Sequence, residues 1–346
     1  MRWNHVCVEA IGYELPEERV STASIEARLG PLYRALHLEP GHVAALTGIR
    51  ERRIWPADVS MARSGARAAM KALGLAGLVG SDLGAVVYAG VCRDNLEPAT
   101  ACAIADALGA SGDVLVFDVS NACLGVLNGM VEIANRIELR QMRAGVVVAG
   151  ESSRAIVDAS VARMNADPTM DRYRLGLATM TGGSGAVAVI LTHSDASYTE
   201  RHLVAGAAVA APEYHRICRW GPDHGLLGET ANVMDTDASQ VLEHGVALGV
   251  RTWERFLEAT GWRSGDVDRV ICHQVGSGHR EAVLRTLGIA PEKDYSTYET
   301  LGNMGTVSVP LTTALAAEAG FLRSGQRVAL LGIGSGLNCL MLGLQW

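Results

Sequence analysis

The sequence has no long apolar run, no strongly basic segment and no nucleotide-binding loop. No stretch of its 346 residues reaches the roughly 18 uncharged apolar residues of a membrane span, and the N-terminus lacks the apolar segment of a signal peptide. The formal net charge is −7, with acidic and basic residues interspersed. These absences argue against a membrane span and against nucleic-acid binding.

Seven cysteines are scattered along the chain, and none forms a CxxC pair. An odd number of dispersed cysteines indicates reduced thiols in a cytoplasmic protein, without a disulfide framework or a metal site. The glycine cluster Gly332–Gly336 follows a strand pattern, but only ten residues come after it in this sequence. That leaves no room for the rest of a dinucleotide-binding unit, so we expect no nucleotide cofactor.

Hydrophobic residues make up 49% of the chain and charged residues 19%, which is enough apolar material for a large core. Short apolar runs alternate with helical patterns, and this alternation predicts an α/β layered fold. The expected strands are Ala85–Tyr88, Val114–Phe117, Val146–Ala149, Ala186–Leu191, Val270–Cys272 and Val328–Leu331. The expected helices are Ser60–Leu73, Cys123–Arg140, Val241–Thr260, His279–Leu287 and Val309–Ala319.

Two pairs of these elements recur at nearly the same spacing. Val87 lies 184 residues before Ile271, and the strand at Val146 lies 182 residues before the strand at Val328. This spacing favours a duplicated α/β unit over chance repetition of common elements. We expect two domains, residues 1–195 and 196–346, that pack closely because no Pro-rich or Ser-rich linker separates them.

Cys123 occupies the position most suggestive of a nucleophile. The apolar strand VLVF ends just before it and a helical pattern begins just after it. At a helix N-terminus, free backbone N–H groups and the helix dipole would stabilise a thiolate. The alternatives are that Cys123 is a small buried apolar residue, as most free cysteines are, or that Cys92, which also follows a strand, is the reactive thiol.

A nucleophilic cysteine needs a polar partner, and two candidates lie in the second half of the chain. His273 ends the strand Val270–Cys272, at the strand edge where α/β proteins form their sites. Asn303 lies between two glycines just before a helix, in Leu301–Ser308. Each alone is also compatible with an ordinary strand end or turn.

The order Cys…HQxx…GNxGxxSxP, together with TGIRER at Thr47–Arg52, resembles the thiolase superfamily and within it the ketoacyl-ACP synthase III-like branch. The resemblance extends over nearly the whole chain. It implies a thiolase fold of two duplicated halves in a five-layered αβαβα sandwich, with Cys123, His273 and Asn303 as the catalytic set.

Three further segments are similar to the head-to-head acyl-CoA condensing enzymes of bacterial olefin biosynthesis. They are Val91–Pro98, Phe117–Met130 and the C-terminal segment from Leu330. In that group the glutamate of the first segment reaches the partner subunit's active site, so the resemblance assigns Glu97 a catalytic role in a homodimer. The other reading is a solvated glutamate before Pro98, near the start of a helix.

The chain departs from the fatty-acid-initiating synthases at two places. His42–Leu46 stands where they carry Trp and Arg to hold the CoA adenine, and their HQAN motif is His273–Gly276 here, without its Asn. The usual CoA contacts therefore do not carry over, and acyl-CoA and acyl carrier protein both remain open as the substrate carrier.

The resemblance implies acyl transfer without a cofactor. Cys123 would be acylated by one thioester, with the backbone N–H groups of Cys123 and Ser335 as the oxyanion hole. His273 and Asn303 would bind the enolate of a second, long-chain thioester, and Glu97 would remove its α-proton or position the group that does. The alternatives are a decarboxylating 3-oxoacyl-ACP synthase III that uses malonyl donors, a non-catalytic partner of a heterodimer, and a cysteine hydrolase.

Overall fold

Nine strands form one continuous sheet in the computed structural model, which describes residues 1–110, 112–222 and 232–346. Their order is β11-β12-β13-β8-β1-β7-β6-β4-β5. These strands are β1 (Val6–Glu14), β4 (Ala85–Tyr88), β5 (Leu115–Asp118), β6 (Ala144–Glu151), β7 (Gly185–His193), β8 (His202–Ala210), β11 (Arg269–Cys272), β12 (Arg327–Gly334) and β13 (Asn338–Gln345). Two small two-stranded sheets pair β2 (Arg19–Ser21) with β3 (Glu51–Arg53), and β9 (Cys218–Pro222) with β10 (Asn232–Thr236).

Helices cover both faces of this sheet. They are α1 (Thr22–Arg28), α2 (Gly30–Leu36), α3 (His42–Thr47), α4 (Met61–Ala76), α5 (Thr100–Leu108), α6 (Gly125–Glu138), α7 (Arg154–Ala166), α8 (Met170–Gly176), α9 (Ala238–Thr260), α10 (Ser277–Leu287), α11 (Tyr298–Leu301) and α12 (Ser308–Glu318).

The sheet consists of two halves that are joined by one residue pair between β1 and β8. The orders β4-β6-β7-β1 and β11-β12-β13-β8 share one pattern, in which a parallel pair is followed by antiparallel neighbours, and β5 adds a second parallel pair to the first half. In the parallel pairs, Val86 faces Val146 and Val270 faces Ala329, so the second pair follows the first by 184 and 183 residues. The chain passes between the halves after His193, and the boundary at residue 195 stays a prediction.

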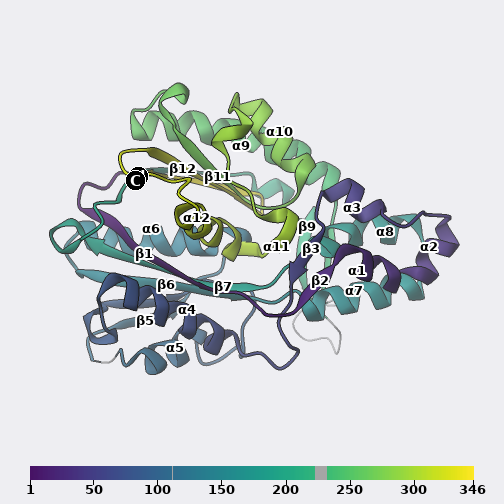
Figure 1. The fold of residues 1–346 in the computed structure, drawn as a ribbon, viewed down its shortest axis with the longest axis horizontal. Helices are drawn as coiled ribbons and strands as arrows, with labels where there is room; N and C mark the ends of the chain where they lie inside the picture. Colours follow the sequence, from purple (N-terminus) through teal and green to yellow (C-terminus); the bar gives the residue numbers. More distant parts are fainter. Residues whose placement is uncertain (111, 223–231) are drawn as a thin grey trace.

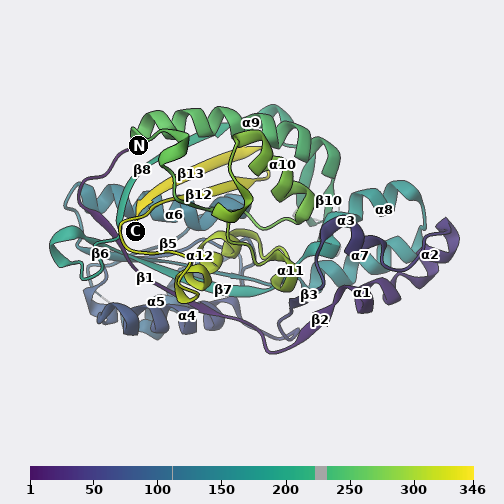
Figure 2. The ribbon, with the colours of Figure 1, turned by 45° about the horizontal axis from the view of Figure 1, so that its top comes forward.

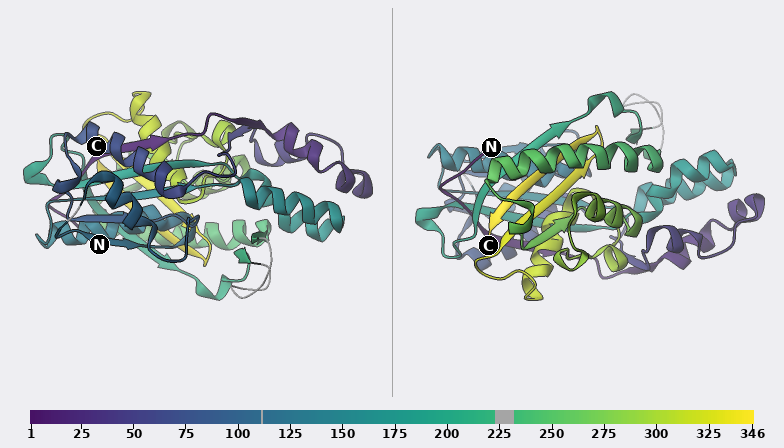
Figure 3. Two further views of the ribbon diagram at one scale, coloured as in Figure 1. Left: turned by 90° about the horizontal axis from the view of Figure 1, so that it is seen from below. Right: turned by 90° about the horizontal axis from the view of Figure 1, so that it is seen from above.

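Five layers are visible in Figures 1 and 2. Helices α4 and α5 cover the outer face of the first half-sheet, α6 and α12 lie between the two half-sheets, and α9 and α10 cover the outer face of the second (Figure 1). The predicted αβαβα sandwich is therefore confirmed. A lobe of α1, α2, α7 and α8 projects beyond the sheets at one end (Figures 1 and 3).

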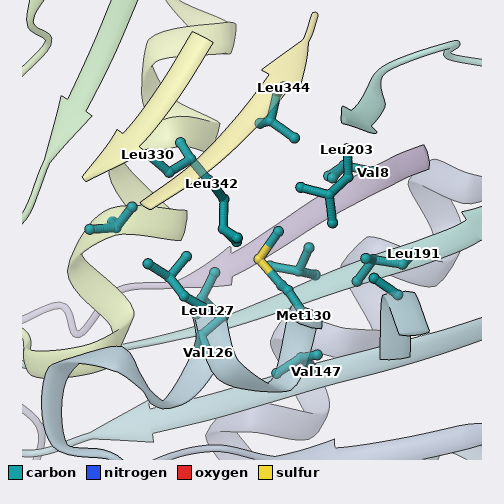
Figure 4. Close-up of a cluster of buried hydrophobic side chains, with 14 of the residues drawn as sticks. Val8, Val126, Leu127, Met130, Val147, Leu191, Leu203, Leu330, Leu342 and Leu344 are labelled. Atoms are coloured by element: carbon teal, nitrogen blue, oxygen red, sulfur yellow. The ribbon is translucent and has the colours of Figure 1, made fainter. Parts of the chain in front are cut away.

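The central layer is the largest apolar cluster of the protein. Met130 of α6 lies among side chains from both half-sheets, including Val8 on β1 and Leu342 on β13 (Figure 4). Full burial of such a side chain contributes about 1.5–3 kcal/mol to stability. The layer thereby locks α6, and with it the turn at Cys123, between the two halves.

The structure contains several elements that the sequence analysis did not predict, among them β1, β13 and α5. Arg154–Thr181 and Arg201–Ala238 look irregular in the sequence, yet they contain the 13-residue helix α7 and the nine-residue strand β8. Strand β8 reads HLVAGAAVA, and its small residues have low strand propensity. It forms because β13 pairs with it along nearly its whole length.

Candidate active site

Cys123 lies where strand meets helix, as predicted. Ala122–Leu124 forms a 3-10 turn after β5, and α6 begins at Gly125. Ala122 has a left-handed φ of 44°, and a Cβ on Gly125 would come within 2.1 Å of the Ala89 carbonyl oxygen. Only glycine at position 125 lets the turn approach the end of β4 this closely.

The Cys123 thiol differs in one respect from the sequence prediction of a stabilised thiolate. Burial first, and then the proximity of Cys218 and Glu151, raises the pKa of Cys123 to about 12. Desolvation disfavours the anion more strongly than the turn's backbone N–H groups favour it. The resting residue is therefore a neutral thiol, and its proton has to leave during the attack.

His273 follows the last residue of β11, with its side chain buried. Its backbone N–H donates to the Leu331 carbonyl on β12, so the position is fixed by the parallel pair. Burial, followed by the nearby His279, lowers the pKa of His273 to about 3. The imidazole is thus neutral near pH 7, with one N–H to donate, and its Nδ1 has no hydrogen-bond partner among the described residues.

The missing Asn of the HQAN motif has a steric explanation. Gly276 occupies that position with a φ of 153°, and a Cβ there would lie 2.8 Å from the Thr47 carbonyl oxygen. Gln274 instead holds the loop, because its Oε1 accepts from the backbone N–H groups of Thr297 and Tyr298. A residue larger than glycine at position 276 would displace the TGIRER segment.

Asn303 is held at both its backbone and its side chain. Its N–H donates to the Thr181 carbonyl, and its own carbonyl accepts from Gly183. The side-chain Oδ1 accepts from the Gly305 N–H at 3.0 Å. This leaves the amide Nδ2 as the donor that can face a substrate oxygen.

A residue that the sequence analysis missed connects Asn303 to Cys123. Thr306 is 1% exposed, and its Oγ1 accepts from the Val126 N–H at 2.7 Å. Val126 is in the first turn of α6, where backbone N–H groups have no partner within the helix. Thr306 therefore joins the Asn303 loop to the start of the helix that follows Cys123. The only signal in the sequence for this residue was its position two residues before Ser308, where α12 begins.

We expect Thr306→Val to destabilise the protein by about 1–3 kcal/mol, because the change keeps the volume but leaves the buried Val126 N–H unsatisfied. The melting temperature should fall by several degrees in differential scanning fluorimetry. Thr313→Val is the matched control: Thr313 is equally buried, but its hydroxyl only donates to the Val309 carbonyl within α12. Equal losses of stability in the Thr306→Val and Thr313→Val variants would contradict the role of Thr306 in satisfying the Val126 N–H.

The tip between β12 and β13 packs on the Cys123 turn. A Cβ on Gly334 would lie 3.3 Å from the Cys123 backbone nitrogen, so Ser335 follows directly after this contact. Asn338 Nδ2 donates to the Ser335 carbonyl and to Oδ1 of Asn121, two residues before Cys123. The two segments predicted to form the oxyanion hole are thus in contact, while the role of Ser335 stays a prediction.

Glu97 is exposed on the loop between β4 and α5. Asp118 at the end of β5 anchors the far side of that loop, accepting from the N–H groups of Thr100 and Ala101 at 3.0 Å each. The structure therefore brings the Cys123, His273 and Asn303 segments to one end of the sheets. It leaves Glu97 at the surface of a single chain.

A buried carboxylate that the sequence analysis also missed lies beside the site. Glu151 ends β6 and is 3% exposed. Its Oε1 accepts from the Val91 N–H at 2.8 Å and its Oε2 from the Cys92 N–H at 3.2 Å. Burial raises the pKa of Glu151 from 4.5 to about 7, against the opposing effect of these hydrogen bonds.

This raised pKa predicts a pH-dependent stability. Between pH 4.5 and 7 the unfolded chain ionises Glu151 while the folded chain keeps it protonated, so the folded state loses stability as pH rises. Glu151→Gln removes this loss, so its stability relative to wild type should improve by about 2–3 kcal/mol from pH 5 to pH 8. Chemical denaturation at the two pH values tests this, and a pH-independent difference would contradict it.

Comparison with known proteins identifies the family. The family profile of the C-terminal domain of 3-oxoacyl-[acyl-carrier-protein] synthase III matches residues 257–346. The acyl-CoA:acyl-CoA alkyltransferase of Shewanella oneidensis is 51% identical over 352 residues, covering 100% of both chains. The chain belongs to the acyl-CoA:acyl-CoA alkyltransferase family. The alkyltransferase of Xanthomonas campestris is 32% identical, again over 100% of both chains.

Solved structures agree with this family. Crystal structures of Xanthomonas campestris OleA superpose on this alkyltransferase at 32% identity. The cerulenin-bound form has a TM-score of 0.94 over 100% of this chain and 98% of the other. A form with bound lauric acid and lauroyl-CoA has a TM-score of 0.93 over 99% and 100%. The alkyltransferase is thus an acyltransferase with the thiolase fold, as its sequence predicted.

Proposed function

We propose that this alkyltransferase joins two long-chain acyl-CoA molecules head to head by a non-decarboxylating Claisen condensation. The observation that carries the proposal is the packing of the Asn303 loop and the Ser335 tip around the Cys123 turn. CoA as the carrier is supported by the names of the two alkyltransferase relatives. The segments Val91–Pro98 and Phe117–Met130 resemble those of the condensing enzymes of olefin biosynthesis. This resemblance supports the proposal that the product is a 2-alkyl-3-ketoacyl-CoA used to form long-chain olefins.

The first half-reaction acylates Cys123. Its sulfur attacks the carbonyl of one acyl-CoA, and the backbone N–H groups of Cys123 and Ser335 stabilise the oxyanion. The C–S bond to CoA then breaks, and the thiol proton of Cys123 ends on the departing CoA sulfur. Because the resting thiol is neutral, proton removal accompanies bond formation.

The second half-reaction forms the carbon–carbon bond. Glu97 removes the α-proton of a second acyl-CoA, while the neutral imidazole of His273 and the Asn303 amide donate hydrogen bonds to its carbonyl oxygen. The carbanion attacks the acyl-Cys123 carbonyl and expels the Cys123 thiolate, which is reprotonated. Every group in this scheme is a side chain, a backbone amide or a substrate, so we propose that the reaction needs no cofactor.

An apolar cavity beside His273 supports a hydrocarbon substrate. It has a volume of about 30 Å³ and lies between α9, α10 and the ends of β11–β13. Its lining includes Val246, Val283, Ile333 and Met341. The lining is almost entirely apolar, which favours contact with hydrocarbon over a charged malonyl group, although a cavity of about 30 Å³ is much smaller than an acyl tail.

The direct test is incubation of the purified protein with myristoyl-CoA alone. The expected products, detected by mass spectrometry, are a 2-alkyl-3-ketoacyl-CoA and one free CoA per condensation. A second incubation with malonyl-CoA added should release no extra carbon dioxide. Condensation only with malonyl-CoA would instead support the 3-oxoacyl synthase reaction, and free fatty acid alone would support a hydrolase.

We further propose a homodimer in which Glu97 acts in the partner's site. Strand β5 has one pairing neighbour, β4, and ends the sheet with Leu115 exposed. The Glu97 loop, with Leu96 84% exposed, is tied to the same strand through Asp118. Pairing of two β5 edges would extend the sheet across a twofold axis and carry each Glu97 loop toward the other subunit.

Mixed dimers provide a test of action in trans. C123A and E97Q chains are each expected to be inactive alone. Co-expressed, they should recover roughly a quarter of wild-type activity, because half of the dimers in a statistical mixture contain one complete site of two. Activity no higher than that of the parent variants would show that Glu97 serves its own chain.

We also propose that the protein is located in the cytoplasm. All seven cysteines are unpaired, as expected in the reducing cytoplasm where acyl-CoA is found. In residues 1–110, 112–222 and 232–346, no helix is both long and apolar enough to cross a bilayer.

A further inference from the structure

Glu151 connects three segments of the active site. Its carboxylate accepts hydrogen bonds from Val91 and Cys92, the first residues of the loop that carries Glu97. On its other side, a Cβ on Gly305 would lie 3.6 Å from the Glu151 carboxyl carbon, so the carboxylate faces the loop of Asn303. Its charge also acts on Cys123.

The loop has other attachments. Asp94, three residues before Glu97, accepts from the Ser60 hydroxyl and from the N–H groups of Met61 and Ala62, whereas the remaining contacts at Cys92 join neutral groups. The Tyr88 hydroxyl lies within hydrogen-bond distance of the carbonyl oxygens of Cys92 and Gly150, and Cys92 Sγ contacts the backbone of Ser152. These contacts hold Cys92 near β6 without an ion. The buried Glu151 carboxylate adds two stronger hydrogen bonds, but its burial lowers the stability of the protein at neutral pH. A residue that served packing alone would not need this charge.

We propose that Glu151 is a positioning residue: it fixes the base of the Glu97 loop in its own chain so that Glu97 reaches the partner subunit's site. This inference rests on the proposed action of Glu97 in trans. It predicts that a change at Glu151 impairs carbon–carbon bond formation and spares acylation of Cys123. It also predicts that the damage appears in the site that receives the loop.

The first test compares E151Q with wild type in the two half-reactions. Glu151 holds the Val91 and Cys92 N–H groups with separate oxygens, and a glutamine in the same position turns an amide NH2 toward one of them, so the loop loses one of its two anchors. Acylation of Cys123 by myristoyl-CoA, measured by intact-protein mass spectrometry, should stay within about threefold of wild type. Condensation should fall at least tenfold, since a misplacement of about 1 Å can reduce a rate by roughly 10²-fold.

The matched control is E138Q. Glu138 also accepts from two successive backbone N–H groups, those of Asn4 and His5, but it ends α6, about 20 Å along the helix from the Cys123 turn. It should retain wild-type rates in both half-reactions. An E97Q/E151Q double variant should lose no more than E97Q alone, because Glu151 acts through Glu97. Independent, multiplying losses would overturn the proposal.

The decisive test places E151Q in one chain of the mixed dimer. In C123A/E97Q dimers the working site combines Cys123 of the E97Q chain with Glu97 of the C123A chain. Adding E151Q to the C123A chain should reduce condensation at least tenfold while the other chain's Cys123 still becomes acylated. No effect from this placement would overturn the inference and leave the trans mechanism intact.

Failure of the trans mechanism and failure of E151Q to fold can each be recognised in these experiments. Inactive mixed dimers without E151Q would overturn both the trans mechanism and this inference. If E151Q does not fold, E151D takes its place in the experiment. The E151D side chain keeps the charge but is one methylene shorter, so it cannot reach the N–H groups of both Val91 and Cys92. The same selective loss in the loop-donating chain is then expected, and wild-type condensation would overturn the proposal.

Discussion

Cys123→Ala is expected to abolish condensation, with a loss of about 10⁴-fold or more, because no other group can carry the first acyl chain. The variant should show no acyl adduct after incubation with myristoyl-CoA, whereas wild type gains one acyl group per chain. Its melting temperature should stay close to that of wild type, since a small half-buried side chain is lost. Intact-protein mass spectrometry and a free-thiol assay for CoA release measure both effects.

Cys7→Ala is the matched control for this experiment. Cys7 is a buried thiol whose pKa is also raised by burial, and its Sγ lies 3.6 Å from Nδ1 of His202. The pair looks like a nucleophile with its base, yet it lies where β1 meets β8. Acylation and condensation should persist in C7A. An acyl adduct that disappears in C7A and persists in C123A would contradict the assignment.

Glu97→Gln is expected to separate the two half-reactions. Condensation should fall by about 10²- to 10⁴-fold, the range typical of a lost general base. Acylation should remain near the wild-type rate, because the first half-reaction removes no α-proton. Stopped-flow measurement of CoA release would show one rapid equivalent of CoA followed by almost no turnover.

Glu39→Gln is the control for the loss of a surface carboxylate. Glu39 is exposed and precedes Pro40, as Glu97 precedes Pro98, but it lies in the lobe between α2 and α3. E39Q should leave both half-reactions unchanged. Equal turnover in E97Q and wild type would remove the basis for a non-decarboxylating mechanism driven by Glu97.

Much of the scaffold could be predicted because its signals are local. The buried parallel strands are continuous apolar runs, and β4 and β11 agree with the sequence prediction to within one residue. Cys123, His273 and Asn303 were singled out by position, because the first two follow strands and the third lies between glycines, and their catalytic roles stay predictions. Strand β8 was missed because its Ala-rich and Gly-rich sequence gains strand structure only from its neighbours.

The supporting residues of the site could not be predicted for a related reason. Thr306 and Glu151 act on segments 180 and 60 residues away in the chain. Their immediate sequence shows only a threonine near the start of a helix and a glutamate at a strand end, which does not identify the distant segments that they contact. The glycine run Thr181–Gly185 is similar: it holds the Asn303 loop by close backbone approach, since a Cβ on Gly183 would lie 2.0 Å from the Leu301 carbonyl oxygen.

The neutral state of the Cys123 thiol has a consequence for its reaction with oxidants and electrophiles. Peroxide and electrophilic drugs attack thiolates far faster than thiols, and a pKa of about 12 leaves almost no thiolate at pH 7. We therefore expect the free enzyme to react slowly with such reagents. In the proposed mechanism a bound thioester supplies both the electrophile and a destination for the thiol proton.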